Sequence, residues 1–534
     1  MSPAQEWQRY LDARQKVDDE LAQLAQIGNS LIADIFLVHQ EILHDRLLTD
    51  AVRQAVEEGS SAATATQQAM SELVQMFQNL SDDYFASRSV DIRDVGQRLL
   101  AHLNGISLTQ QLATLPPDTI LLAEDLTPFD ATHLSPDRVV GIALAGSAPT
   151  AHTAILARSL GIPLICGVGE AVLYLPPGQI GIVDGLQGRL LAEPDEELLE
   201  SYAQTRQRLL TFRISAESHG QEDAVTLDGQ RVFVHANINS REDMLQIATS
   251  GADGIGLLRT EYLFQDRTKP PTVEEQLDAY RQISQQTPGE ILTVRLLDIG
   301  GDKPVHYLPQ QAESNPFLGV RGIRLLLQHP ELLRDQLQAL VSLSQEKGFT
   351  GVVRILVPMI SKVIEVRRVL EVLDGIPGYR EQHAKVRNLQ VGLMIEVPSA
   401  ALLADRLAPL VDFFSIGTND LAQYTLAADR VNSAVASLAS PLDPSVLRLI
   451  SMTCQAGQQA GIPVSLCGEM AGDPSIFPLL YGLGVTEVSV VAPAVALVKE
   501  AVRQTDGDAA RRLAQSALQA SRAQEVHRLL HPEG

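Results

Sequence analysis

Two reactive side chains lie far apart in this chain, each beside an expected structural boundary. The segment Pro149-Thr-Ala-His-Thr-Ala-Ile155 places His152 at the start of an expected helix. The segment Ser465-Leu-Cys-Gly-Glu-Met470 places Cys467 where an expected β-strand passes into a loop. A nucleophile in one domain and an acid with anion and metal ligands in another suggest phosphoryl transfer between parts that move.

His152 has a setting that suits a phosphoryl group. The amino end of a helix presents free N–H groups and the positive end of the helix dipole, and both stabilise phosphate. An imidazole there can attack phosphorus and hold the group as a phosphoramidate. The alternative is an ordinary capping or surface histidine, and the local sequence does not separate the two.

Carboxylates follow two neighbouring expected strands. Glu396 ends the run Val391-Gly-Leu-Met-Ile-Glu396, and Asp420 follows Ser415-Ile-Gly-Thr-Asn419. Two carboxylates at adjacent strand ends suit Mg²⁺ and leave room for substrate oxygens and water. The amide of Asn419 can hydrogen-bond a phosphate. The alternative is two unrelated polar residues at the rim of a barrel.

Several arginines indicate an anionic ligand. Arg295 lies inside an otherwise apolar segment, 293–298, where a charge is costly unless it meets an anion. Guanidinium groups pair in a bidentate manner with both carboxylate and phosphate. Lys303 can add a point charge, and Arg324 is equally consistent with an exposed helix position. The arginines on or just after expected strands, or at expected helix starts, are Arg259, Arg295, Arg321, Arg324 and Arg430.

The chain has three cysteines, and only one is expected to be reactive. A buried thiol is usually inert packing, which we expect for Cys166 and Cys454. Cys467 stands beside Gly468 at the end of an expected strand, near the arginines. That position favours proton transfer by the Cys467 thiol over a purely structural role.

The composition limits the class of protein. With 534 residues the chain should form two to four domains, and 45% hydrophobic residues indicate a globular protein. A formal net charge of -23 argues against nucleic acids and anionic membranes as partners. The apolar stretch 488–498 contains Pro493 and is too short to span a bilayer. We expect no signal peptide, no disulfide framework and a cytoplasmic location.

The first part of the chain predicts three units. Residues 1–105 are poor in proline and glycine and carry apolar residues at helical spacing, which predicts a bundle of four or so helices. Residues 106–194 contain short apolar runs and one clear helix, 151–160, and predict a small α/β domain that carries His152. Residues 195–222 predict a polar connecting helix.

The last unit, 223–534, alternates strands and helices in the manner of a (β/α)₈ TIM barrel, which makes the whole chain a multidomain α/β protein. Such barrels carry their chemistry at the carboxyl ends of the strands. The residues that fall at these ends are Arg259, Asp298 with Gly300 and Gly301, Met359, Glu396, Asn419, Asp420 and Cys467. The expected strands are 232–238, 254–259, 293–299, 353–360, 391–397, 413–418, 462–468 and 487–491.

Taken together, these segments resemble the Enzyme I family of the bacterial phosphotransferase system, the phosphoenolpyruvate–protein phosphotransferases. The resemblance runs from about residue 1 to residue 530, in the same order of domains. Its most specific motifs are Thr150-Ala-His-Thr-Ala-Ile155, Gly256-Leu-Leu-Arg-Thr-Glu-Tyr-Leu-Phe264, Asp298-Ile-Gly-Gly-Asp-Lys303, Asn315-Pro-Phe-Leu-Gly319, Phe414-Ser-Ile-Gly-Thr-Asn-Asp-Leu421 and Leu466-Cys-Gly-Glu-Met-Ala-Gly472.

The resemblance implies a set of roles. His152 would be phosphorylated on Nε2, and Cys467 would protonate the enolate carbon to give pyruvate. The helical region 1–105 would dock the phosphocarrier protein HPr, in the first step of sugar uptake, and the barrel would form a homodimer. Phosphoenolpyruvate would be held by Arg259, Arg295, Asn419, Asp420 and Arg430, and Mg²⁺ by Glu396 and Asp420.

The chain departs from the family pattern at two places. The family usually has an amino-terminal strand segment with Ser-Pro-Gly, whereas this sequence begins in the helical region. We therefore expect the small α/β domain to lack that strand, unless the chain starts further upstream. The family's Gly-Gly-x-Thr-Ser-His reads Ser147-Ala-Pro-Thr-Ala-His152 here, which changes the loop around the nucleophile.

Three other functions fit parts of the sequence. Pyruvate phosphate dikinase and phosphoenolpyruvate synthase share the histidine domain and the barrel, but they need an ATP-binding domain for which this chain has no room. A catalytically impaired phosphoenolpyruvate sensor would not need His152 and Cys467. An aldolase-type lyase would leave residues 1–193 unexplained. The downstream branch, whether sugar uptake, dihydroxyacetone phosphorylation or nitrogen regulation, cannot be read from the sequence.

Overall fold

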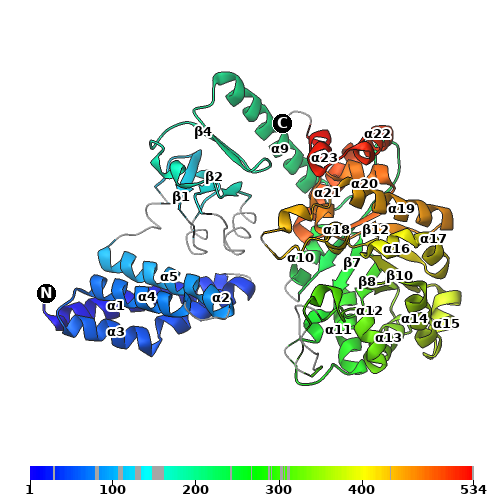
Figure 1. The fold of residues 1–534 in the computed structure, drawn as a ribbon, viewed down its shortest axis with the longest axis horizontal. Coiled ribbons are helices and arrows are strands. Elements are labelled where there is room, and N and C mark those ends of the chain that lie inside the picture. Colours follow the sequence, from blue (N-terminus) through cyan, green and yellow to red (C-terminus); the bar gives the residue numbers. More distant parts are fainter. Residues whose placement is uncertain are drawn as a thin grey trace. The chain divides into compact units, whose positions relative to one another are not determined.

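The computed structural model forms two compact units, Met1–Gln207 and Arg208–Gly534, which are described separately below (Figure 1). Side chains are outside the description at 23–35, 37, 78, 83–90 and 385. The residues that the structure describes are 1–27, 30–78, 83–105, 112, 114–124, 126, 134–146, 161–240, 243–265, 267–286, 289, 291–300, 305, 307–308, 313–432 and 434–531.

The first unit begins with a bundle of helices, as predicted. Five are found in its described part, where the sequence predicted four or so. Asp45 caps the third of them by accepting a hydrogen bond from the Leu47 N–H. The third helix buries Leu48, Val52 and Val56, four residues apart, on one face. The helices are α1 Pro3–Ile27, α2 Ser30–Leu43, α3 Arg46–Glu57, α4 Ala62–Gln78 and α5 Asp83–Asn104.

A buried polar cluster ties α2 to α5. His39 is 1% exposed, and its Nδ1 lies 3.2 Å from Asp94 while its Nε2 lies 3.3 Å from Asp91. Asp94 also accepts a 2.7 Å hydrogen bond from Arg98. Burial acts to lower the pKa of His39, but the two carboxylates outweigh it and the pKa is raised.

The small α/β part of the first unit contains two sheets. Strands β1 Thr119–Ala123, β2 Val139–Leu144 and β3 Leu164–Cys166 are parallel in the order β1-β2-β3, and β4 Gly181–Asp184 pairs with β5 Arg189–Ala192 in antiparallel fashion. The expected helix 151–160, with His152, lies outside the described residues. Helix α9, Glu196–Ser218, follows the sheets and corresponds to the predicted connecting helix.

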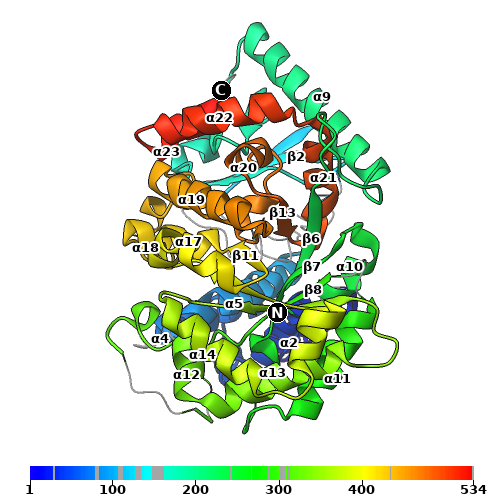
Figure 2. The same ribbon diagram turned by 90° about the vertical axis from the view of Figure 1, so that its right-hand side faces the viewer.

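The second unit contains a closed parallel barrel of eight strands in the order β6 to β13, which confirms the predicted TIM-barrel fold. Its helices lie around the outside of the strands (Figures 1 and 2). The strands are β6 Phe233–Ile238, β7 Gly254–Arg259, β8 Ile291–Arg295, β9 Val352–Val357, β10 Leu389–Ile395, β11 Phe413–Ile416, β12 Val464–Leu466 and β13 Glu487–Val490.

Helices alternate with the strands of this unit, and two short ones, Pro398–Leu402 and Ala404–Leu407, are separated at Leu403. The described helices are α10 Asp243–Ser250, α11 Val273–Gln286, α12 Ile323–Gln328, α13 Pro330–Ser344, α14 Val363–Asp374, α15 Tyr379–Glu381, α16 Pro398–Leu402, α17 Ala404–Leu407, α18 Thr418–Leu426, α19 Pro444–Ala460, α20 Phe477–Leu483, α21 Val495–Gln504, α22 Gly507–Gln519 and α23 Ala523–Leu530.

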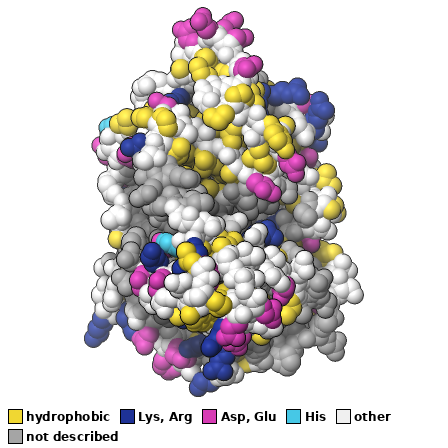
Figure 3. Space-filling model, turned by 90° about the vertical axis from the view of Figure 1, so that its left-hand side faces the viewer, with side chains coloured by type: hydrophobic (Ala, Val, Ile, Leu, Met, Phe, Trp, Pro, Cys, Tyr) yellow, Lys and Arg dark blue, Asp and Glu magenta, His cyan; other side chains and the backbone are white. Residues whose placement is uncertain are grey.

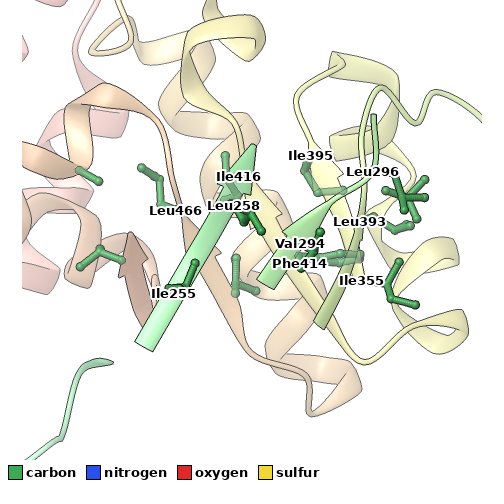
Figure 4. Packing of buried hydrophobic residues seen from close by; sticks show 14 of the residues in the cluster. Ile255, Leu258, Val294, Leu296, Ile355, Leu393, Ile395, Phe414, Ile416 and Leu466 are labelled. Carbon is green, nitrogen blue, oxygen red and sulfur yellow. The ribbon is translucent and has the colours of Figure 1, made fainter. Parts of the chain in front are cut away.

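The barrel strands have two different faces. Side chains on the outer face are apolar and pack against the helices, as Ile355, Phe414 and Leu466 do (Figure 4). Because neighbouring residues in a strand point to opposite faces, the residues between them line the barrel interior. That interior includes polar groups, among them Arg354 and Glu487.

Arg354 and Glu487 form an ion pair across the barrel interior. The Nη1 atom of Arg354 lies 2.7 Å from Oε2 of Glu487, and its Nε donates to Gln390 at 2.9 Å. The Nε2 of His235 lies 3.6 Å from the same carboxylate. Burial acts to raise the pKa of Glu487, but His235 and Arg354 outweigh it and lower the pKa to about 2.

Replacing Glu487 by alanine should destabilise the protein by about 3–5 kcal/mol at pH 7, because Arg354 would remain buried without its partner. The pKa of Glu487 is lowered from 4.5 in the folded protein. The contribution of its carboxylate to the free energy of unfolding is therefore complete above pH 4.5 and is lost as the pH falls toward about 2. Urea unfolding at several pH values measures it. A double change, Arg354→Met with Glu487→Met, should recover part of the loss, and an unaffected Glu487→Ala variant would contradict the assignment.

Candidate active site

A pocket of about 80 Å³ opens at the carboxyl ends of the barrel strands, where the sequence predicted the chemistry. The pocket is lined by the seven barrel residues to which the resemblance assigned a role, namely Arg259, Arg295, Glu396, Asn419, Asp420, Arg430 and Cys467. The other lining residues are Leu257, Asp298, Gly300, Phe317, Arg321, Met394, Gly417 and Gly468. The structure therefore brings together side chains from widely separated parts of the sequence.

Arg295, the last residue of β8, meets carboxylates of the protein itself. It is 8% exposed, and its Nη2 lies 2.7 Å from Oε1 of Glu261 while its Nη1 lies 3.4 Å from Asp298. Burial acts to lower the pKa of Arg295, but the two carboxylates outweigh it and raise the pKa. The sequence predicted that Arg295 meets an anion. Glu261 and Asp298, two carboxylates of the barrel itself, supply part of that negative charge.

Arg321 continues this set of ion pairs on the other side of Asp298. Its Nη2 lies 2.8 Å from Asp298 and 3.1 Å from Asp420. Asp420 in turn lies 3.3 Å from Nη2 of Arg430, whose side chain is 40% exposed. Positive and negative groups therefore alternate around the pocket, which holds each of them in a fixed position.

Arg324 does not line the pocket. Its Nη1 donates hydrogen bonds of 3.1 Å to the carbonyl oxygens of Leu318 and Gly319. Of the two interpretations given for this residue, the structural one fits the geometry.

Arg259, the last residue of β7, differs from the other arginines of the pocket. Its side chain makes no hydrogen bond and no ion pair with any residue that the structure describes, and its Nε is buried without a partner. Burial and the neighbouring charge of Arg295 lower the pKa of Arg259. A half-buried guanidinium without an anion is costly, so this site is prepared for an anionic ligand.

Glu396 and Asp420 place two carboxyl groups in the pocket. Glu396 is 2% exposed, and burial together with Asp420 and Asp298 raises its pKa to about 8. Its Oε1 accepts a 2.6 Å hydrogen bond from the N–H of Met359, a residue with φ of 59° at the end of the neighbouring strand. Oδ1 of Asp420 is buried and makes no hydrogen bond with a described residue.

Such a pair of carboxylates fits a divalent cation that keeps several ligands from water and substrate. Groups of three or more His, Cys, Asp and Glu side chains suited to a metal do not occur among the described residues. A cation here would therefore rely on Glu396 and Asp420 together with oxygens from outside the protein.

Asn419, at the start of α18, is held by Glu469. Its Nδ2 donates to Oε1 of Glu469 at 2.8 Å, and its Oδ1 accepts from the Glu469 N–H at 3.1 Å. These two bonds orient the amide and leave one of its two N–H groups for a ligand.

The Cys467 thiol is 5% exposed and lies among the apolar side chains of Leu257, Leu356, Met394 and Phe413. Burial raises the pKa of Cys467, so the sulfur carries its proton at neutral pH. A protonated thiol beside the pocket is suited to act as an acid.

The other two cysteines do not line this pocket. Cys454 lies in the hydrophobic core, where burial raises its pKa to about 12, as expected for inert packing.

His152 and Lys303, which the sequence also singled out, lie outside the described residues. Asp298, which the sequence placed near the end of an expected strand, holds Arg321 in the pocket. Glu261 was quoted only as part of a motif, although it holds Arg295. Its position just after the expected strand 254–259 was the available signal.

The sequence was also compared with known proteins. Residues 214–507, more than half of the chain, match the family model of the PEP-binding domain of PEP-utilising enzymes. The chain belongs to the PEP-utilising enzyme family. Residues 1–88 match the amino-terminal domain of these enzymes, and residues 115–188 match their mobile domain. The resemblance stated from the motifs is thereby confirmed.

Curated relatives of the family match over nearly the whole chain. A phosphoenolpyruvate-protein phosphotransferase of Bacillus sp. (strain S) is 38% identical over 526 residues, covering 97% of this chain and 90% of the relative. That of Geobacillus stearothermophilus is 39% identical over 506 residues, covering 94% and 86%. A multiphosphoryl transfer protein of Rhodobacter capsulatus is 41% identical over 499 residues, covering 93% of this chain and 59% of that protein.

This member of the PEP-utilising enzymes is therefore a phosphotransferase of the phosphoenolpyruvate-protein phosphotransferase type. In the part of the chain that the structure describes, no helix combines the length and apolar character needed to cross a bilayer.

Proposed function

We propose that this enzyme transfers the phosphoryl group of phosphoenolpyruvate to Nε2 of His152 and then to an HPr-type phosphocarrier, leaving pyruvate. In this role it would perform the first step of sugar uptake in the cytoplasm. The observation that carries the proposal is the unpaired guanidinium of Arg259 in a pocket that also holds two carboxylates and a buried thiol.

The charges around the pocket match a substrate with a carboxylate and a phosphate. Arg259 is free to pair with one anionic group, and Arg430, partly exposed at the rim, is placed for another. Arg295 and Asn419 would add donors deeper in the pocket, and Asp420 would position Arg430 and Arg321. The arginines and carboxylates around the site are otherwise equal in number: Arg259, Arg295, Arg321 and Arg430 against Glu261, Asp298, Glu396 and Asp420.

The high pKa of Glu396 indicates a need for a cation, because burial and the neighbouring Asp420 and Asp298 make its ionised carboxylate unfavourable. A polyanionic substrate would leave the pocket strongly negative unless a divalent ion entered with it. Glu396 and Asp420 would hold Mg²⁺, because both carboxyl groups line the pocket and Oδ1 of Asp420 makes no hydrogen bond with a described residue. The bound ion would neutralise developing negative charge on the substrate oxygens.

The chemical steps would involve His152, the arginines of the pocket and Cys467. Nε2 of His152 attacks phosphorus in line with the bridging oxygen, whose bond to phosphorus breaks and whose electrons form the enolate of pyruvate. The arginines stabilise the charge on the phosphoryl and carboxylate oxygens. Cys467 then gives its proton to the methylene carbon of the enolate, and pyruvate is complete.

The parts of the chain would divide this work. Residues 1–105 would dock the carrier, 106–194 would carry His152, 195–222 would connect the first part of the chain to the barrel, and 223–534 would bind phosphoenolpyruvate and form a homodimer.

On the face of the molecule seen in Figure 3, acidic and basic side chains are interspersed. Docking of HPr would then depend on local complementarity rather than on the net charge of -23.

Incubation with labelled phosphoenolpyruvate tests the proposal. With Mg²⁺ the chain should acquire a phosphoryl group that is lost in acid, retained in base and passed to added HPr, with one pyruvate per label. A metal chelator should prevent labelling. Label that survives acid, or binding of phosphoenolpyruvate without any label, would count against the proposed function.

Replacing Cys467 by alanine should leave phosphoenolpyruvate binding unchanged and slow pyruvate formation on the order of 100-fold, because the enolate loses its acid. Calorimetric titration with phosphoenolpyruvate and a coupled pyruvate assay measure the two quantities. Cys454→Ala, another buried thiol but outside the pocket, serves as the control. Equal rates of pyruvate formation in Cys467→Ala and the unaltered enzyme would remove the thiol from the mechanism.

A further inference from the structure

Ser415 makes direct contact with the thiol proposed as the acid. It lies on β11, has no exposed surface, and its Oγ donates a hydrogen bond of 3.2 Å to Sγ of Cys467. The two strands are in parallel register, with Ser415 opposite Ser465 and Ile416 opposite Leu466. Cys467 follows directly after that register, so the serine reaches its sulfur from the neighbouring strand.

The hydrogen bond decides where the thiol proton can point. Because the serine O–H occupies a lone pair of the sulfur, the S–H bond is directed away from Ser415. In this arrangement the S–H donates a hydrogen bond to the carbonyl oxygen of Ile416, at 3.6 Å from Sγ. A thiol is a weak donor, so breaking this bond to turn the proton toward the pocket costs little.

The hydrogen bond from Ser415 would also stabilise the thiolate that forms when Cys467 gives up its proton. Leu257, Leu356, Met394 and Phe413 surround the sulfur and offer it no hydrogen bond. Among the described residues, no side chain other than Ser415 donates a hydrogen bond to Sγ. A thiolate in such surroundings is unfavourable unless a donor stabilises it, and a hydrogen bond to a charged acceptor is stronger than one to a neutral acceptor.

Other charged groups act on the sulfur only from a distance. Burial is the main influence on the pKa of Cys467 and raises it, and Glu396 acts in the same direction. The Ser415 hydroxyl, Arg295 and Arg259 act in the opposite direction. Ser415 is the member of this set that touches the sulfur and is not itself needed for substrate or metal in the proposed site.

We propose that Ser415 is a positioning residue for proton donation by Cys467. The inference rests on the proposed function, in which the enolate of pyruvate forms in the barrel pocket. The S–H bond breaks and its electron pair stays on sulfur as a thiolate, which the Ser415 hydroxyl stabilises. The proton bonds to the methylene carbon through the π electrons of the enolate, the enolate oxygen becomes the ketone oxygen, and water later returns a proton to the sulfur.

The test separates phosphoryl transfer from proton transfer. Ser415→Ala should slow pyruvate formation by about tenfold to hundredfold, as expected for loss of a hydrogen bond to a charged group. The KM for phosphoenolpyruvate and the rate of labelling from phosphoenolpyruvate in a single turnover should stay within about twofold of the unaltered enzyme, because neither involves the thiol. The solvent deuterium isotope effect on pyruvate release should increase, since proton transfer becomes slower than the other steps.

Ser465→Ala is the matched control. Ser465 is also a buried serine of this strand pair, but its Oγ donates to the carbonyl oxygen of Phe414 at 3.2 Å and not to the thiol. It should retain the rate and the isotope effect of the unaltered enzyme. Ser415→Thr, which keeps the hydroxyl, should restore most of the rate lost in Ser415→Ala.

The outcomes are distinguishable. Equal pyruvate rates for Ser415→Ala and Ser465→Ala would overturn the inference while leaving the proposed function intact. A normal pyruvate rate in Cys467→Ala would instead overturn the acid role on which it rests. If Ser415→Ala does not fold, Ser415→Cys, a weaker donor of similar size kept under reducing conditions, takes its place, and an unchanged rate in it would overturn the inference.

Discussion

His152→Ala is expected to reduce labelling of the chain by phosphoenolpyruvate to background, the largest effect of any single change. The barrel pocket contains no other group proposed to accept a phosphoryl group, and its thiol is protonated. The barrel should still bind phosphoenolpyruvate with Mg²⁺, because the residues proposed to hold both lie at the ends of the barrel strands. Acid-labile label per chain and the affinity for phosphoenolpyruvate are the two measurements.

The control for this change is His219→Ala. His219 is exposed after α9, and its Nδ1 lies 2.9 Å from the Ser215 carbonyl oxygen. The His219→Ala variant should acquire label at His152 as the unaltered chain does. Passage of label to HPr should fail only in His152→Ala. Persistent acid-labile label in that variant would mean that another histidine is the acceptor, and loss of phosphoenolpyruvate binding would mean that His152 contributes to the substrate site.

The strands of the barrel were predictable because each is a short apolar run bounded by turn-forming residues. The residues at which these strands begin and end were harder to predict. The run expected at 293–299 forms the strand Ile291–Arg295, and the chain then leaves the sheet, which carries Asp298 to the pocket. The run expected at 462–468 shortens to Val464–Leu466, since Ile462 and Pro463 follow the end of α19.

The types of residue in the site were also predictable, but their pairing was not. Arg321 and Asp420 are 99 residues apart in the sequence, and Arg354 and Glu487 are 133 apart. No local pattern indicates which carboxylate an arginine will meet. From the sequence, Arg295 was expected to pair with an anionic ligand. In the structure Arg295 lies 2.7 Å from Glu261, and Arg259 is the arginine whose side chain has no described partner.

Glu396→Gln is expected to lower the rate of phosphoryl transfer by at least about 1000-fold, because the proposed Mg²⁺ site would lose one of its two carboxylates and with it several kcal/mol of charge stabilisation. The amide is close to the carboxylate in size, so the pocket should keep its shape. Labelling from phosphoenolpyruvate as a function of Mg²⁺ concentration measures the loss. Glu365→Gln, whose carboxylate accepts a hydrogen bond from the Ser361 N–H outside the pocket, should retain activity.

The same change should not weaken the metal-free fold, and this separates a lost metal ligand from a damaged barrel. Burial, Asp420 and Asp298 raise the pKa of Glu396 to about 8, which means that its negative charge is unfavourable in the folded protein. A neutral glutamine removes that penalty, so with chelator present the Tm of Glu396→Gln should equal or exceed that of the unaltered enzyme. Added Mg²⁺ should raise the Tm of the unaltered enzyme and leave that of the variant unchanged. An equal rise in both would exclude Glu396 as a ligand, and a lower metal-free Tm would show that the carboxylate serves the fold.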